Sequence, residues 1–503
     1  MIKVVLFDMD GTLINSDQLV IHIYEKLTKT YPPNIPFESL DLGDVFAASY
    51  PDVLQMLYGE FKQEHLDEIF RLHNETKHRY LQSFEGVDEL LKDLKHQGYR
   101  LGLVTSELRS IALDELHILH LDHYFDHIVA FDDVKNPKPD PEGLHDHLKF
   151  FHCKSDEAIY IGDQKSDGKA AENALIYSVL MDWNHAKSLE YKQCFDHIAH
   201  DVQELMSIIH YLDTNEIIIS EKKSFNVLQF TDLHLMNDEK DEKTYTLMRD
   251  MVEYTKPQFI VLTGDQTMSR EAVMLYERLS VFMDELKVPY TYVFGNHDVE
   301  SNTTYQELID VMKSSKYLIF NQGPAHLGYS NHSILLKSKA RKTLGVLVFI
   351  DTHIDEIYEV NHEKKWGYGA ISRDQIMWYN RLIKRHPHPH LMFFHIPIPE
   401  VKDAKREDQK HQGDYYETPC TPPVNTGFFT TALQTNQAKG MFFGHDHLND
   451  FCYNKDGILL CYGRVSGHYD YAMPGFPKGA RLIQFSQGHV ETHIILHQDI
   501  KKG

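Results

Sequence analysis

The chain lacks a long hydrophobic run: no apolar stretch approaches the roughly 20 residues that a membrane-spanning helix needs. It also lacks an excess of basic residues, with 51 Lys and Arg against 74 Asp and Glu and a formal net charge of −23. Because an acidic surface repels the phosphate backbone, this charge argues against a nucleic-acid-binding protein. Five cysteines in 503 residues do not make a disulfide framework, so the sequence favours a reducing, cytoplasmic location.

The remaining composition is that of a globular protein, with 42% hydrophobic and 25% charged residues. A chain of 503 residues is long enough for two to four domains of about 100–200 residues each. Histidine is unusually frequent, at 33 residues. We expect most of these side chains to be solvated, and the functional ones to stand at the ends of strands beside acids and glycines.

Short apolar runs alternate with amphipathic helical stretches, which is typical of buried parallel strands in an α/β fold. In the first block the expected strands are residues 4–7, 101–105, 128–131 and 158–161. A long helical stretch after the first strand predicts an inserted helical cap over about residues 15–82. A second block has expected strands at 226–230, 259–262, 290–294, 345–350, 390–394 and 439–443. The sequence therefore predicts two domains, 1–212 and 225–503, joined by a polar linker at 213–224.

Acidic, hydroxyl and amino side chains follow the predicted strands of the first block. They are Asp8, Asp10, Thr105, Lys138, Asp163 and Asp167. The carboxyl ends of parallel strands meet at one edge of a sheet, so these side chains can converge there. Three or more acids make a Mg²⁺ site, and a hydroxyl and an ammonium beside it can hold phosphate oxygens.

The order of these residues resembles the haloacid dehalogenase (HAD) phosphatase superfamily over roughly the first 210 residues. The resemblance implies a Rossmann-like parallel sheet with an inserted helical cap. It also implies that Asp8 is a nucleophile that forms an aspartyl-phosphate and ligates Mg²⁺. Asp10 would be the acid–base residue, with its backbone carbonyl on the metal.

The same resemblance gives roles to the later motifs. Thr105 and Lys138 would bind the phosphoryl group, and Asp163 would complete the coordination of Mg²⁺. Asp167 would support Lys138 or a metal-bound water.

Segments of the first block are similar to bacterial phosphoglycolate phosphatases and HAD-type inorganic pyrophosphatases. They are residues 84–87, 98–105 and 131–134. In these enzymes the cap sets the substrate, and residues 42–46 of the expected cap do not match the usual substrate loop. Pyrophosphate is therefore one candidate among several small phosphomonoesters.

The second block carries five motifs, each after an apolar run. They are Thr231-Asp232-Leu233-His234, Gly264-Asp265, Gly295-Asn296-His297-Asp298, His395 and Gly444-His445-Asp446-His447. Two divalent cations about 3.5–4 Å apart require a bridging carboxylate, and imidazoles select Zn, Fe or Mn over Mg or Ca. The spacing therefore predicts a dinuclear metal site.

These motifs resemble the calcineurin-like metallophosphoesterase family from about residue 225 to 496, which implies a β-sandwich flanked by helices. A bridging hydroxide would attack phosphorus. His297 would protonate the leaving oxygen or stabilise its developing charge, oriented by Asp298. The implied ligands of one metal are Asp232, His234, Asp265 and His447, and those of the other are Asp265, Asn296, His395 and His445.

Residues 393–400, 427–431 and 444–451 look like the branch related to purple acid phosphatases. True purple enzymes place a tyrosine ligand three residues after the bridging Asp, where this chain has Met268. The loss of phenolate removes the charge-transfer colour and weakens the case for ferric iron.

Other notable residues have weaker functional cases. We expect Trp366 and Trp378 to be packing anchors in a helix-rich insertion. We expect Cys452 and Cys461 to be packed on either side of a hairpin turn. Tyr469, Asp470 and Tyr471 are as well explained by turn packing as by substrate contact.

The sequence thus predicts a two-domain phosphohydrolase that acts on small phosphorylated substrates, with no membrane or nucleic-acid partner. Its oligomeric state is left open. One alternative is that only one domain turns over substrate and the other keeps its ligands as a regulatory or binding module. A metal-dependent nuclease is a second alternative, and the charge of −23 disfavours it.

Overall fold

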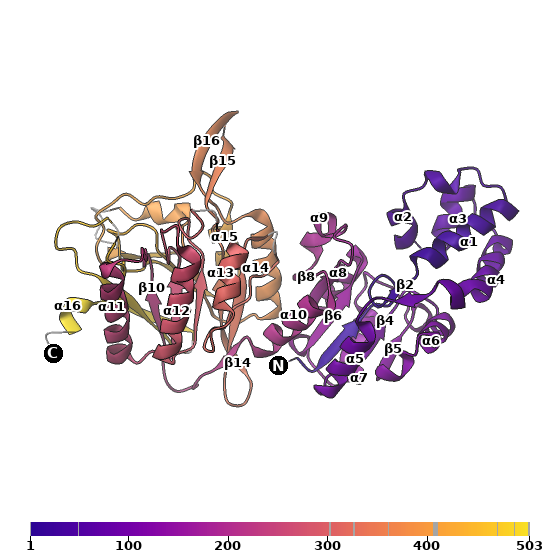
Figure 1. The fold of residues 1–503 in the computed structure, drawn as a ribbon, viewed down its shortest axis with the longest axis horizontal. Coiled ribbons are helices and arrows are strands. Elements are labelled where there is room, and N and C mark those ends of the chain that lie inside the picture. Colours follow the sequence, from indigo (N-terminus) through magenta and orange to yellow (C-terminus); the bar gives the residue numbers. More distant parts are fainter. Residues whose placement is uncertain are drawn as a thin grey trace. The chain divides into compact units, whose positions relative to one another are not determined.

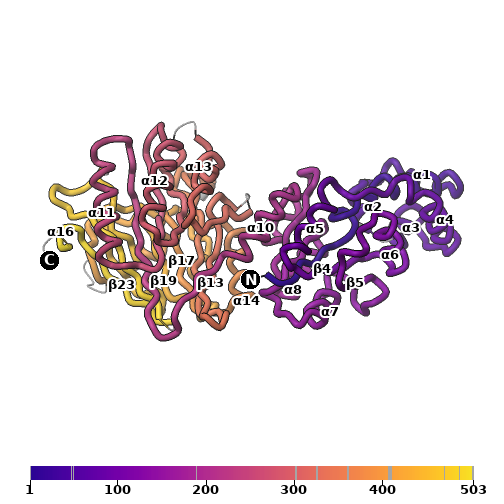
Figure 2. Tube along the Cα trace, turned by 60° about the horizontal axis from the view of Figure 1, so that its bottom comes forward, coloured from indigo at the N-terminus to yellow at the C-terminus, as the bar shows by residue number. Residues whose placement is uncertain are grey.

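The computed structural model describes residues 2–48, 50–300, 303–324, 327–360, 362–405, 411–469, 471–486 and 488–500. The chain divides into two compact units, Met1–Leu212 and Asp213–Gly503. In Figures 1 and 2 the first unit is coloured from indigo to magenta, and the second from magenta through orange to yellow. Asp470, considered above as a substrate contact, lies outside the described residues. None of the helices in the described part of the chain has the length and apolar content that crossing a membrane requires.

A six-stranded parallel sheet forms the centre of the first unit, in the order β5-β4-β1-β6-β7-β8. The strands are β1 (Val4–Phe7), β4 (Arg100–Val104), β5 (His127–Val129), β6 (Ala158–Gly162), β7 (Tyr177–Met181) and β8 (His197–Ala199). All residues of β1 and β6 are buried, as expected for strands covered on both faces. The predicted α/β sheet is confirmed.

Helices pack on both faces of this sheet. Side chains alternate between the faces of a strand, so Val5 and Phe7 join the apolar cluster of α5, α6 and α10, whereas Val4 and Leu6 join that of α7 and α8. The helices are α5 (Val87–His96), α6 (Arg109–Ile118), α7 (Glu142–Phe150), α8 (Lys165–Ala174) and α10 (Val202–Thr214), and the short α9 (Ser188–Tyr191) lies between β7 and β8 in the chain. Because both faces of β1 are buried in this way, the strand is fixed in the core, and Asp8 follows directly at its carboxyl end.

Four helices are inserted after β1, within the range that the sequence predicts for a cap. They are α1 (Asp17–Thr30), α2 (Leu42–Ala47), α3 (Tyr50–Tyr58) and α4 (Gln63–Tyr80). The chain enters and leaves them through an antiparallel ribbon of β2 (Ile14–Asn15) and β3 (Gln82–Ser83). This ribbon begins four residues after Asp10, so the cap connects directly to the loop that carries the first motif.

The second unit contains two larger sheets. The five-stranded sheet has the order β12-β11-β10-β22-β23, and the eight-stranded sheet the order β18-β20-β21-β19-β17-β14-β13-β9. The strands of the first are β10 (Phe225–Phe230), β11 (Phe259–Thr263), β12 (Tyr290–Val293), β22 (Gly479–Ser486) and β23 (His489–Leu496). Those of the second are β9 (Glu216–Ile218), β13 (His332–Lys337), β14 (Thr343–Phe349), β17 (His390–Phe393), β18 (His411–Gln412), β19 (Ala438–Phe443), β20 (Cys452–Lys455) and β21 (Ile458–Tyr462).

The two sheets pack face to face, and helices cover their outer faces. An apolar cluster between the sheets combines Val227 and Ile483 of one with Leu347 and Phe393 of the other. Separate clusters bury the outer face of each sheet under its own helices, and Figure 1 shows α11, α12 and α13 side by side. The helices are α11 (Glu239–Thr255), α12 (Ala272–Leu286), α13 (Tyr305–Met312), α14 (Arg373–Arg385), α15 (Phe428–Gln434) and α16 (His497–Ile500). The predicted sandwich flanked by helices is confirmed.

The segments around the sandwich differ from the sequence prediction in two places. Residues 213–224, expected as a linker, contain β9, which pairs in parallel with β13. Trp366 lies not in a helical insertion but in β16 (Glu363–Tyr368), paired with β15 (Asp355–Val360), and 62% of it is exposed. The packing-anchor interpretation is wrong for Trp366, because an isolated two-stranded hairpin has no core to bury it. It fits Trp378, which is buried in α14.

A disulfide joins Cys452 and Cys461, which the sequence interpretation treated as packed thiols. The turn at Asp456-Gly457 sets the register of β20 and β21, and this register places the two cysteines directly opposite each other. The predicted hairpin turn is present, and the pairing register that follows from it is the feature that makes the disulfide possible.

Candidate active sites

The carboxyl edge of the first unit's sheet gathers the predicted acids. Asp8 follows β1, and Asp163 and Asp167 follow β6 at the start of α8. One carboxylate oxygen from each of the three lies within 4.8 Å of the others, and all three side chains are buried. The two strands are neighbours in the sheet, so side chains 155 residues apart in sequence share one site.

Lys138 lies between two of these acids. Its Nζ donates to Asp8 Oδ1 at 2.5 Å and to Asp167 Oδ1 at 2.6 Å. Tyr160 Oη also donates to Asp167 Oδ1, at 2.9 Å. Burial alone would lower the pKa of Lys138, but the charges of Asp167 and Asp8 outweigh it and raise this pKa well above its ordinary value. The lysine therefore carries a fixed positive charge beside Asp8.

Asp10 and Thr105 border the same edge. The Asp10 carboxylate accepts a hydrogen bond from Ser16 Oγ at 2.7 Å, and burial raises its pKa well above the ordinary value. Thr105 follows β4, is buried, and its hydroxyl oxygen accepts from the backbone N–H of Glu107 at 3.0 Å. Its own hydroxyl proton is not engaged in that bond.

Asp163 shows that these residues fit a divalent cation. Its Oδ1 is buried and has no hydrogen-bond partner among the described residues, while its Oδ2 forms an ion pair with Lys187. Burial raises the pKa of Asp163 to about 6 and that of Asp8 well above its ordinary value. Gly11, at φ +73°, keeps the space open, because a Cβ there would lie 2.1 Å from Asp163 Oδ2. Crowded, buried carboxylates of this kind favour a hard cation.

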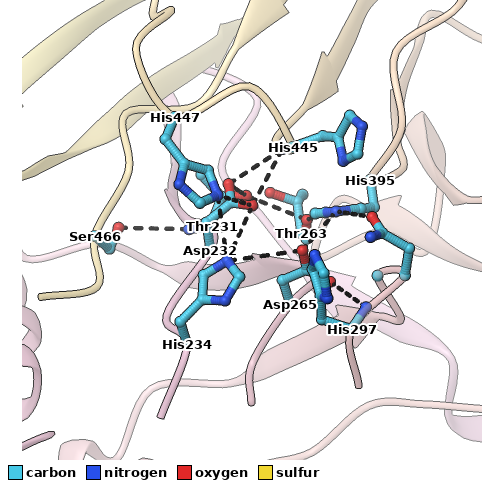
Figure 3. Close-up of polar contacts among 12 residues, drawn as sticks. Thr231, Asp232, His234, Thr263, Asp265, His297, His395, His445, His447 and Ser466 are labelled. Carbon is cyan, nitrogen blue, oxygen red and sulfur yellow. Dashed lines mark hydrogen bonds and ion pairs between the residues drawn. The ribbon is translucent and has the colours of Figure 1, made fainter. Parts of the chain in front are cut away.

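The second unit brings its five motifs together where β10, β11, β12, β17 and β19 end (Figure 3). Asp232, His234 and His447 form one group, and Asp265, His395 and His445 form the other; all six are buried. Asp265 reaches both, because its Oδ2 is 3.1 Å from His395 Nε2 and 3.7 Å from His234 Nε2. Asn296 Oδ1 is 3.1 Å from His395 Nε2. The expected ligand residues are therefore adjacent.

Four of these side chains have backbones in the left-handed region. The φ angles are +52° for Asp232, +45° for His234, +52° for Asp265 and +79° for His445. Non-glycine residues seldom adopt this conformation, and such strain concentrates at functional sites. The tight turns that follow the strands direct these side chains to a common point.

The imidazoles of the second unit also fit divalent cations. Burial lowers the pKa of His234 to about 4 and that of His445 to about 3, so both rings are neutral and able to ligate. His445 Nε2 is buried without a hydrogen-bond partner among the described residues. His395 Nδ1 is 2.8 Å from the Thr263 carbonyl oxygen, which fixes the ring and leaves Nε2 toward Asp265. Mixed imidazole and carboxylate ligands suit Zn, Mn or Fe.

His297 has a different partner from the one expected. Its Nδ1 is 2.5 Å from Glu300 Oε1. Asp298 instead accepts hydrogen bonds from the backbone N–H groups of Gly295 at 2.8 Å, Thr267 at 3.1 Å and Asp265 at 3.2 Å. A buried carboxylate with three backbone donors is held by the loops, so Asp298 shapes the site and Glu300 orients His297.

Replacing Gly264 with Ala should destabilise the second unit and weaken its hold on metals. A Cβ at Gly264 would lie 2.4 Å from His395 Nδ1, and the residue has φ +90°. Gly457→Ala is the matched control, because Gly457 also has φ +90° but no atom within 4 Å of an added Cβ. Both variants bear the strain of the φ angle, but only Gly264→Ala adds overpacking of about 1–3 kcal/mol. Urea unfolding and metal content measure the difference, and equal losses in the two variants would contradict the steric argument.

Sequence reasoning missed several residues that contact the site residues. They are Ser16, Tyr160 and Lys187 in the first unit, and Glu300, Tyr368 and Tyr471 in the second, where Glu417 accepts a hydrogen bond from Tyr471. For Tyr471 the sequence supports turn packing and substrate contact equally, and the position of Glu300 three residues after His297 is a signal that could have indicated its role. Lys187 has no sequence signal, because a loop held by Asp182 brings it to Asp163.

The profiles of two families match the chain at these two sites. Residues 5–181 match the family described as "Haloacid dehalogenase-like hydrolase". Residues 225–449 match the family described as "Calcineurin-like phosphoesterase". Both matched ranges include the predicted metal-site residues of their unit.

Known proteins resemble each unit separately. "Pyrophosphatase PpaX" from Halalkalibacterium halodurans is 32% identical over 211 residues, which cover 41% of this chain and 97% of the relative. "Probable inactive purple acid phosphatase 29" from Arabidopsis thaliana is 28% identical over 300 residues, 52% of this chain and 76% of the relative. Among solved structures, a haloacid dehalogenase-like family hydrolase from Streptococcus pneumoniae is 23% identical with a TM-score of 0.35, over 41% of this chain and 98% of its own. The chain belongs to the haloacid dehalogenase-like hydrolases through its first unit, its second unit matches the calcineurin-like phosphoesterases over residues 225–449, and the two matches indicate a phosphoric ester hydrolase.

Proposed function

We propose that the chain is a bifunctional phosphohydrolase with one metal-dependent site in each unit. The observation that carries the proposal is the convergence of two separate groups of buried metal-ligand side chains, one in each unit. In the first unit the substrate is a small phosphomonoester or pyrophosphate, as in the PpaX relatives by name. In the second unit it is a phosphomonoester or phosphodiester.

In the first unit, the Asp8 carboxylate attacks phosphorus and forms an aspartyl-phosphate. Asp10 donates a proton to the leaving oxygen and later takes one from the attacking water. Lys138 and Thr105 hold the phosphoryl oxygens and offset their charge. A Mg²⁺ held by Asp8, Asp163 and the Asp10 carbonyl would neutralise negative charge at the phosphate.

In the second unit, His297 stands at the edge of the ligand groups and donates a proton to the leaving oxygen. Glu300 fixes the ring through Nδ1, which leaves Nε2 for this transfer. The ligand residues would hold two divalent cations, which supply an activated water and neutralise the charge of the phosphate when bound. Mn, Fe and Zn suit the donor set better than Mg.

One observation favours a second candidate, in which the second unit binds phosphate esters without turnover. The plant relative of this unit is named inactive. The proposal of an active unit rests instead on the residues of this chain, because Asp265, Asn296, His297, His395 and His445 are all competent for their roles.

Separate inactivation of the two units tests the proposal. The full chain, loaded with Mg²⁺ and Mn²⁺, is assayed on a phosphomonoester, a phosphodiester and pyrophosphate, together with the variants Asp8→Asn and His297→Ala. We expect each variant to lose a different set of activities. If His297→Ala changes none of them, the second unit is a binding module.

A further inference from the structure

An apolar pair lies on the hairpin β15–β16, which projects from the second unit (Figure 1). Ile357 and Trp366 are directly opposite each other across the two strands. Their exposed fractions are 72% and 62%, and that of Ile357 is the highest of the large hydrophobic side chains in the described part of the chain. Single exposed apolar residues are ordinary, but a cross-strand pair of this size on one face indicates a binding surface.

A row of aromatic rings connects this pair with a metal-site histidine. Trp366 and Tyr368 are two residues apart in β16, so both lie on the same face of the hairpin. Their ring centroids are 5.3 Å apart. The Tyr368 ring then meets the ring of His445 edge-on at 4.4 Å. The exposed face of the hairpin is therefore continuous with the proposed dinuclear site.

The base of the hairpin is held in place. Tyr358 Oη donates to the Tyr368 carbonyl oxygen at 2.8 Å, and Gly369 N–H donates to the Ile354 carbonyl oxygen at 2.5 Å. At Gly367 the backbone lies so close to Pro423 that a Cβ would be 2.5 Å from the proline ring. These contacts keep the Trp366–Tyr368 row at a fixed distance from the site.

A second aromatic side chain borders the other ligand group. The Tyr471 ring stacks on His447 at a centroid distance of 4.2 Å, and its hydroxyl donates to Glu417 Oε2 at 2.9 Å. Each ligand group thus has a tyrosine in ring contact with one of its histidines. A planar group attached to a phosphate between these tyrosines would meet aromatic surface.

We propose that the Ile357–Trp366–Tyr368 face binds the leaving group of the phosphoester cleaved at the second unit, and that this leaving group carries an aromatic ring. The inference rests on the proposed function of that site. Asp355 and Glu359 share the face with Ile357, against one lysine, Lys364, so a polyphosphate chain would be repelled there. An uncharged ring gains from stacking on Trp366.

Competition between two non-hydrolysable phosphonates tests this inference. Hydrolysis by the second unit is measured in the full chain with Asp8→Asn, and phenylphosphonate and methylphosphonate are the inhibitors. Trp366→Ala should raise the inhibition constant of phenylphosphonate about 3- to 10-fold, which is the weakening of binding expected when one aromatic contact is lost. The constant of methylphosphonate should change less than twofold, and Trp366→Phe should restore most of the selectivity. Equal shifts for both inhibitors, or no shift, overturn the inference.

A control and a second measurement separate this inference from the proposed function. Tyr254→Ala on α11, where the side chain is 63% exposed, should leave both inhibition constants unchanged. If the Asp8→Asn protein hydrolyses no phosphoester, the proposed activity of the second unit fails. Calorimetric titration of the Mn²⁺-loaded chain with the two phosphonates then tests aromatic binding by the hairpin without any need for turnover. A preference for phenylphosphonate that Trp366→Ala removes supports it, and equal or undetectable binding of both overturns it.

Discussion

Asp8→Asn is expected to lower phosphatase activity of the first unit by about 10³-fold or more, the scale on which removal of a nucleophile acts. The amide retains the shape of the carboxylate but cannot form the aspartyl-phosphate. The fold should survive, because Lys138 keeps its second ion pair with Asp167 at 2.6 Å. The measurement is turnover of the best phosphomonoester or pyrophosphate in the presence of Mg²⁺, with His297→Ala present to silence the second unit.

Two further variants make this result specific. Asp8→Ala should be equally inactive, which excludes residual activity from deamidation of the Asn. Asp146→Asn, at an exposed aspartate whose partner is His127, should keep full activity. Retention of more than about a tenth of the activity by both Asp8 variants would rule out a covalent mechanism at this residue.

Asp265→Asn is expected to abolish hydrolysis by the second unit and to reduce its metal content. The Asp265 carboxylate lies within 3.7 Å of an imidazole from each ligand group, and its Oδ1 accepts from the His297 backbone N–H at 2.8 Å. Neutralising a carboxylate that two metal positions share removes negative charge from both of them. A loss of activity of about 10²-fold or more should therefore accompany the loss of metal. Turnover and elemental analysis are measured on the same preparation.

Asp446→Asn is the matched control for this prediction. Asp446 is buried between the two histidines of the Gly444–His447 motif, but its carboxylate accepts from Tyr462 Oη at 2.6 Å and from the Cys420 backbone N–H. It belongs to neither ligand group. The Asp446→Asn variant should therefore retain both metals. Equal metal loss in the Asp265→Asn and Asp446→Asn variants would indicate general destabilisation and not a bridging role of Asp265.

Sequence patterns predicted the parts of the molecule that follow from strand and turn chemistry. Acids that follow β1 and β6, and the His and Asp motifs after β10, β11 and β19, were placed correctly at strand ends because each comes directly after a buried apolar run. The edge that these strands share in each sheet then brings the side chains together. This explains why ligands more than 200 residues apart, such as Asp232 and His447, could be grouped from the sequence.

Features that depend on rotamers or on loop paths could not be predicted in this way. Glu300 and Asp298 are both near His297 in sequence, and only the turn geometry decides that Asp298 faces the backbone N–H groups. Lys187 reaches Asp163 through a loop whose path the N–H groups around Asp182 determine. The hairpin β15–β16 is rich in charged residues and has no regular apolar alternation, so its strands gave no signal.

Anomalous diffraction from crystals soaked in Mn²⁺ decides whether both units bind divalent cations, because it locates the ions independently of turnover. We expect two adjacent peaks in the second unit, one on either side of the Asp265 carboxylate. A separate peak should lie between Asp8 and Asp163 in the first. Well-ordered side chains with no peak at either position would contradict the assignment of both sites.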